Sequence, residues 1–175
     1  MRIKILCCSG LILLAGATQS CQTVDDNRIP NMPVNIAIAD VGMWNTYGVS
    51  GYGVNRNFIL TSSGTRIPAG FPYTTTSATG FGGVLLIEGL DPFTATSSMP
   101  LAYDLACPVE RKPEVRVKVD AETYYAVCPV CESVYDVTLG AGAPVTGVAA
   151  TGTYKYGLKM YSCIASGNGG YFITN

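Results

Sequence analysis

Hydrophobic residues recur at every second position in several short segments, which is the period of a β-strand with one buried face. Residues 34–38 (VNIAI) alternate in this way, and residues 115–119 (VRVKV) alternate valine with positive charge, which predicts a half-exposed strand. Residues 82–90 (GGVLLIEGL) are more uniformly apolar and predict a central strand. Helical periodicity is hard to find. The pattern therefore predicts a chain built from strands.

Shorter apolar runs between turn residues complete the predicted sheets. Strands are expected at residues 57–60, 101–105, 124–127, 134–139, 158–164 and 171–174, with another beginning at Phe93-Thr94-Ala95. Residues 61–78 carry two prolines and many hydroxyl groups, and predict a long surface loop. The predicted fold class is all-β, with one domain at residues 32–175.

The N-terminus has the pattern of a secretion signal. Arg2 and Lys4 precede an apolar run at residues 5–17. At 1.5 Å per helical residue this run is too short to cross ~30 Å of hydrocarbon. Residues 1–20 are therefore predicted to be a signal peptide that is removed on export.

The signal ends in Thr18-Gln19-Ser20-Cys21, small residues followed by a cysteine, as in the segments that lipoprotein signal peptidase cuts. We expect lipid on the Cys21 thiol and an acylated new N-terminus; an ordinary cut that leaves Cys21 free is the alternative. Three acyl chains would exceed the two signals needed for stable anchoring. Residues 21–31 are then a lipidated tether, the membrane is a partner, and the predicted location is the cell envelope.

Charge excludes one class of partner. Removing Arg2 and Lys4 from the eleven basic residues leaves nine against twelve acidic ones, a net charge of −3. The basic residues nearest to a cluster, at 111–118, are interspersed with other residues. A nucleic-acid partner is therefore not expected.

Cysteine is the residue type with the most chemistry to offer. Cys7 and Cys8 leave with the signal and Cys21 takes lipid, so four of the seven cysteines remain. These four are Cys107, Cys128, Cys131 and Cys163. Two loops hold three of them, at residues 106–110 (ACPVE) and 128–133 (CPVCES), and each loop follows a predicted strand. Disulfides are permitted in an exported protein.

The order of these loops resembles that of a Rieske domain. The second loop is followed by Val134-Tyr135-Asp136, a glycine-rich turn at 140–144 and a segment, LKMY, at 158–161. The resemblance is closest to exported Rieske-like lipoproteins of Bacteroidetes, which also begin near a strand like that at 29–34 (IPNMPV). It covers most of residues 29–175 and is specific from 104 to 161.

This resemblance implies Rieske-like stacked antiparallel sheets and a small cluster-binding-type subdomain, with tip loops at 104–112, 127–136 and 140–150. It also implies an outer-membrane lipoprotein. Asp25 and Asp26, close to the lipid cysteine, resemble an acidic signal for surface exposure.

The cluster ligands of the family are only half present. A Rieske centre needs two thiolates on one iron and two imidazoles on the other. Cys107 and Cys128 match the thiolate positions, whereas Val109 and Cys131 stand where the histidines belong. The whole chain has no histidine, so its composition excludes an intact Rieske centre.

Three alternatives remain for the cysteine loops. The favoured prediction has no cofactor and a disulfide between Cys107 and Cys128, with Cys107–Cys131 as the rival pair. Zinc held by Cys107, Cys128, Cys131 and water is a second possibility. A [2Fe–2S] cluster would need Cys163 as its fourth thiolate. Cys163 is expected on a strand leaving the tip, over ~15 Å away, as a small buried thiol.

No catalytic residues are predicted. The chain has no Ser/His/Asp set, no readable pair of carboxylates and no phosphate-binding loop, so an enzyme is not expected. Glu110 and Glu132 flank the cysteine loops and are interpreted as solvated charge. The predicted function is a membrane-anchored structural or binding lipoprotein with a degenerate Rieske-like domain, whose protein or glycan partner is unknown. The alternative is an electron-transfer protein with an unusual cysteine-ligated [2Fe–2S] or metal centre.

Overall fold

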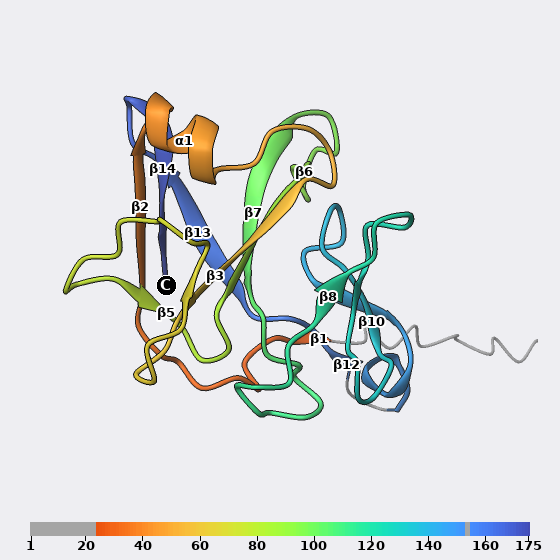
Figure 1. Cartoon of the computed structure of the whole chain (residues 1–175). Coiled ribbons are helices and arrows are strands. Elements are labelled where there is room, and N and C mark those ends of the chain that lie inside the picture. Colours follow the sequence, from red (N-terminus) through yellow and green to blue (C-terminus); the bar gives the residue numbers. More distant parts are fainter. Residues whose placement is uncertain (1–23, 153–154) are drawn as a thin grey trace, which may run out of the picture.

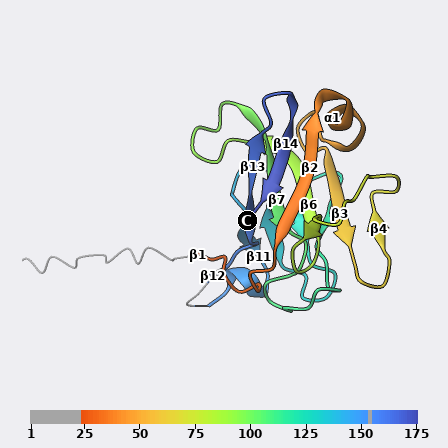
Figure 2. The same ribbon diagram turned by 90° about the vertical axis from the view of Figure 1, so that its left-hand side faces the viewer.

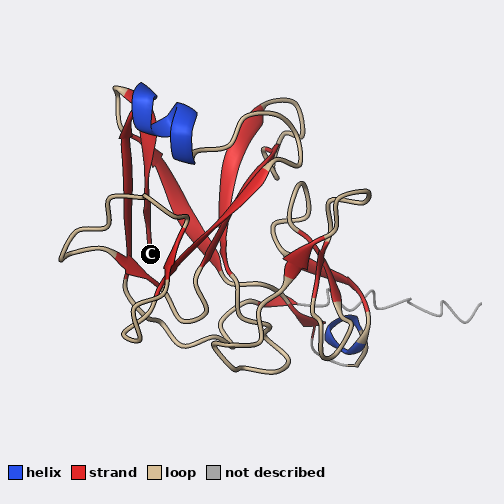
Figure 3. Cartoon of the chain, in the orientation of Figure 1, coloured by secondary structure: helices blue, strands red, loops and turns tan. Residues whose placement is uncertain are grey.

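The computed structural model describes residues 24–152 and 155–175 and confirms the all-β fold class (Figure 3). The predicted signal peptide and Cys21 lie outside the described residues. No helix in the described part of the chain is long and apolar enough to span a membrane.

The largest sheet in the described chain, with eight strands, forms the body of the molecule (Figure 1). Its strands, in the described chain, are β2 (Val34–Asp40), β3 (Asn55–Leu60), β4 (Arg66–Ile67), β5 (Ala78–Thr79), β6 (Val84–Leu90), β7 (Ser98–Asp104), β13 (Met160–Ala165) and β14 (Gly169–Thr174). Their order is β4-β3-β6-β7-β13-β14-β2-β5, and neighbouring strands are antiparallel. The predicted central strand, β6, does lie inside the sheet.

A smaller sheet lies beside the lower end of β7 in Figure 1. It contains β8 (Lys118–Val119), β9 (Ala126–Val127), β10 (Val134–Asp136) and β11 (Ala143–Thr146) in the order β11-β10-β9-β8. Next to it, β1 (Val24–Asp25) pairs in parallel with β12 (Lys155–Tyr156). Figure 2 shows β13, β14 and β2 side by side, with β1 and β12 below them.

The central strands bury side chains on both faces. Leu85 and Ile87 of β6 belong to a core between the large and small sheets, while Val84 and Leu86 belong to a second core on the opposite face. Successive side chains of a strand point to opposite faces, so a strand between two cores must be apolar throughout. This explains why residues 82–90 lack the alternation seen at 34–38.

The two sheets touch closely at Gly89. The backbone N–H of Leu90 donates to the carbonyl of Thr138 (2.7 Å), which joins β6 to the loop after β10. A Cβ atom at position 89 would overlap the Thr138 carbonyl. Only glycine lets the two backbones approach this closely without displacement.

Residues expected to be a tether are partly built into the domain. β1 starts at Val24, and Ile29 is buried. The guanidinium of Arg28 lies 3.9 Å from the centre of the Tyr156 ring. The N-terminal segment therefore reaches the folded domain within three residues of Cys21.

The strand predicted to begin at Phe93 is wrong. Asp91 accepts a hydrogen bond from the N–H of Phe93 (2.8 Å), and the Asp91 N–H donates to the Ser97 carbonyl (2.9 Å). These bonds close a loop with Ala95 in the left-handed region at φ 53°. Phe93 is 96% exposed, so its aromatic ring marks a loop tip and not a strand.

The strand predicted at 115–119 is shorter than its pattern. Only Lys118–Val119 forms β8, and Arg116 makes a single bridge to Ala106. The alternation is nevertheless real, because Val117 is buried and Val115 and Val119 are half-buried. The segment pairs with the chain just before Cys107 through a few separate hydrogen bonds.

One short α-helix and one 3-10 turn in the described chain were not predicted. In addition, the loop predicted at 61–78 contains the short strand β4. The helix α1 (Val41–Tyr47) begins where the Asp40 carboxylate accepts from the Met43 N–H (2.9 Å). It buries no residue completely, so its sequence has no apolar stripe of helical period. A 3-10 turn, η1 (Val148–Ala150), lies in the third tip loop.

Candidate metal centre

Each of the two cysteine loops begins just after a strand. Cys107 lies three residues beyond the end of β7, and Cys128 directly follows β9. Cys131 lies between Cys128 and β10. The core between the two sheets encloses Cys107 and Cys128, while Cys131 is half-buried at its edge.

Asp104 fastens the first cysteine loop to the large sheet. Its buried carboxylate accepts hydrogen bonds from the N–H groups of Phe81 (2.9 Å), Gly82 (3.0 Å) and Ala106 (2.7 Å) and from the Tyr161 hydroxyl (2.6 Å). All four partners are donors, which suits a carboxylate. Burial and the neighbouring Asp104 raise the pKa of Tyr161, so its hydroxyl stays protonated and keeps donating.

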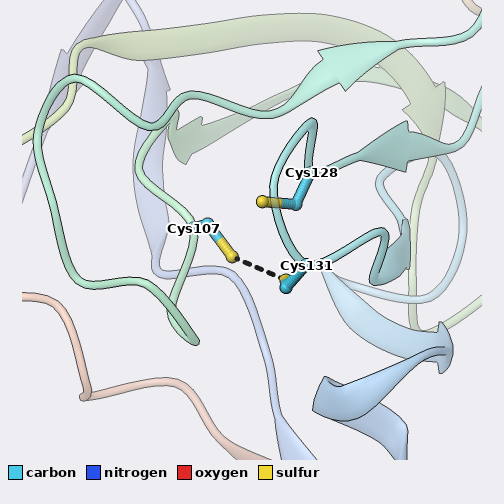
Figure 4. Close-up of side chains that lie close together, drawn as sticks. All are labelled: Cys107, Cys128 and Cys131. Atoms are coloured by element: carbon cyan, nitrogen blue, oxygen red, sulfur yellow. Dashed lines mark hydrogen bonds between the residues drawn. The ribbon is translucent and has the colours of Figure 1, made fainter.

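The three cysteines meet at one point (Figure 4). Their Sγ atoms all lie within 4.8 Å of one another, and those of Cys107 and Cys131 are 3.6 Å apart. Among the described residues this is the only such group of cysteine, histidine or acidic side chains. The two loops meet as predicted. The Cys107 sulfur lies within hydrogen-bond distance of that of Cys131, although Cys128 was the favoured partner.

These sulfur distances suit a single metal ion. Sulfurs at ~2.3 Å from a tetrahedral zinc ion lie about 3.8 Å apart, whereas a disulfide requires about 2.05 Å. The four described cysteines are free thiols in this structure. Cys107, Cys128 and Cys131 are therefore close enough to bind a metal ion.

The surroundings of Cys107 and Cys131 differ. Burial raises the pKa of the Cys107 thiol to about 12, although N–H groups of the loop and the Tyr135 hydroxyl, 3.5 Å away, act against it. Burial also raises the pKa of Cys131, but hydrogen bonding with the Ser133 hydroxyl and N–H and with the other two thiols outweighs it, so the pKa falls. Of these two thiols, Cys131 is therefore the more accessible and the one with the lower pKa.

Ser133 links the second cysteine loop to the third tip loop. Its buried hydroxyl oxygen accepts from the Cys131 thiol (3.3 Å) and from the Ala149 N–H (3.0 Å). Since both bonds use lone pairs, the hydroxyl keeps its own proton, which it can turn toward a thiolate at Cys131. Gly147 has φ 83°, and a Cβ there would press on the Ser133 backbone. The loop at 140–150 therefore supports the cysteines without supplying a ligand.

Val109 and Cys163 take no part in the group. Val109 is half-buried and packs against the core between the sheets, and it offers no donor atom. Cys163 lies in β13 and packs against the other core, which keeps it away from the three thiols as expected. A buried thiol was predicted here, whereas Cys163 is half-buried. Burial nevertheless raises its pKa to about 12.

Asp104 was missed by the sequence analysis. The available signal was a lone acidic residue inside the apolar run at 101–107 (LAYDLAC), where an unpaired charge would be costly.

Comparisons with family models, with curated proteins and with solved structures found no match, so the cysteine group is interpreted from its own geometry.

Proposed function

We propose that this protein is an exported lipoprotein whose β-domain binds one zinc ion through Cys107, Cys128 and Cys131. The gathering of the three sulfurs within 4.8 Å carries the proposal. Zinc is the ion that tetrahedral thiolate sites favour among non-redox metals. The resemblance to Rieske domains supports the same location, because Cys107 and Cys128 match its thiolate positions.

A single ion suits this group better than an iron–sulfur cluster. A [2Fe–2S] cluster needs four protein ligands divided between two irons. Among the described residues three ligands gather here, around one centre, and Cys163 is not with them. Within the described part of the chain, the electron-transfer alternative therefore lacks a fourth thiolate.

Zinc binding should depend on three cysteines and not on the fourth. The purified mature protein is expected to bind about one zinc ion per chain, as three thiolates around one centre require. Replacing Cys107, Cys128 or Cys131 with serine should lower the affinity about 100-fold or more, because loss of supporting residues alone costs 10- to 100-fold. Competition with a chromophoric chelator measures the affinity, and metal analysis measures the content.

Cys163→Ser is the matched control and should bind zinc like the parent protein. The proposal is wrong if the parent takes up no zinc, or if peptide mapping without reductant finds Cys107 cross-linked to Cys128 or Cys131 in the exported protein. A brown protein with stoichiometric iron would favour the electron-transfer alternative.

The anchor is tested at Cys21. Cys21→Ala should abolish lipidation and leave an unprocessed precursor or a soluble protein, because the cysteine thiol is the acceptor of the diacylglycerol. Mass spectrometry of the N-terminal peptide and fractionation after a carbonate wash check this. A variant that still sediments with membranes after the wash would contradict the lipoprotein assignment.

A further inference from the structure

The two turns that carry the cysteines have the same backbone shape. Both begin with Cys-Pro-Val, at 107–109 and at 128–130. In the first turn the N–H of Arg111 donates to the carbonyl of Cys107 (2.9 Å), and in the second the N–H of Glu132 donates to that of Cys128 (3.1 Å). The fifth residue is left-handed in both, with φ 54° and 57°. The site is thus built from two matching turns.

Backbone N–H groups act on a sulfur atom in each turn. Those of Val109 and Glu110 act to lower the pKa of Cys107, and that of Ser133 acts to lower the pKa of Cys131. Such donors favour a thiolate over a thiol. At Cys107 burial outweighs them and the pKa is raised, so it is the matching shape of the turns that places the sulfurs around a cation.

The fourth residue of each turn occupies an equivalent position. In the second turn it is Cys131, whose sulfur meets that of Cys128. In the first turn it is Glu110, which is half-buried like Cys131. Since the two backbones match, the Glu110 side chain leaves the chain from the position that corresponds to Cys131.

We propose that Glu110 is the fourth ligand, which makes the centre a Cys3Glu zinc site. This inference rests on the proposed zinc binding. Zinc accepts a carboxylate oxygen at ~2.0–2.2 Å, and structural sites are almost always four-coordinate. The Glu110 carboxylate lies outside the group of three sulfurs in this structure. A rotation of its side chain toward the sulfurs is therefore part of the proposal. Glu132 is the fifth residue of its turn and is exposed, so it is not equivalent.

Cobalt(II) in place of zinc tests the geometry, because each cobalt–thiolate bond adds charge-transfer absorption in the near ultraviolet. In the purified mature protein, Glu110→Cys should raise this absorption by about one third, since the thiolates increase from three to four. Val109→Cys, one residue away, should leave it unchanged. Glu110→Gln should weaken zinc binding at least ~10-fold, while Glu132→Gln should bind like the parent protein.

The outcomes separate this inference from the proposed function. If the parent protein binds neither cobalt nor zinc, the proposed zinc site fails and the fourth ligand fails with it. If the parent binds but Glu110→Cys adds no absorption and Glu110→Gln binds as tightly, Glu110 is not a ligand and the three-cysteine site stands. A gain from Val109→Cys alone would place the third residue of the turn, and not the fourth, next to the ion.

Discussion

Replacing Asp104 with alanine should lower the free energy of unfolding by about 4 kcal/mol. The carboxylate is fully buried and accepts from three backbone N–H groups and the Tyr161 hydroxyl. Alanine would leave all four donors without an acceptor, and each such group that is buried costs ~1–3 kcal/mol before the structure relaxes. Urea denaturation of the parent and variant proteins measures the difference.

Tyr161→Phe is the matched control for this prediction. It removes one donor and leaves the Asp104 carboxylate with its three N–H partners, so it should cost only about 1 kcal/mol. If Asp104→Ala is no more destabilising than Tyr161→Phe, the carboxylate is not the attachment point that its hydrogen bonds indicate. Because Asp104 holds the N–H of Ala106, the residue before Cys107, its loss should also weaken zinc binding although Asp104 is not a ligand.

The sequence predicted the fold wherever one rule dominated a segment. Residues 34–38 alternate because one face of β2 is buried, and residues 82–90 are apolar throughout because β6 lies between two cores. It misled at Phe93, where an aromatic residue suggested a strand but the side chain of Asp91 closes a loop. Local hydrogen bonds of this kind compete with strand formation and carry no period.

The candidate site was predictable in its members but not in its geometry. The order of the loops resembles that of a Rieske domain, and this resemblance predicted that Cys107 and Cys128 lie close together. Spacing alone did not show that the sulfur of Cys131 lies 3.6 Å from that of Cys107. Nor did it show that the first and second turns match, because a left-handed residue at Arg111 or Glu132 is not visible in the composition of the turn. Glu110 therefore looked like ordinary surface charge.

Removing the metal should loosen the small sheet and leave the large sheet folded. The core on the outer face of β6 contains none of the three proposed zinc ligands, whereas Cys107 and Cys128 lie inside the core between the sheets. A ligand at 1,000 times its dissociation constant stabilises the folded state by ~4 kcal/mol. The zinc-loaded protein is therefore expected to lose about this much stability in the small sheet when a chelator strips the ion.

Hydrogen exchange with and without chelator tests this directly. The N–H groups of Cys107 and Cys128, which donate to the carbonyls of Val115 and Ser133, should exchange faster after chelation. Those of β2 and β14, paired along five registered positions, should keep their protection. Cys131→Ser should behave like the chelated parent protein and not respond to chelator. Unchanged protection at Cys107 and Cys128 would show that the ion contributes no stability there, whereas loss of protection throughout would show that the large sheet depends on the metal-bound tip.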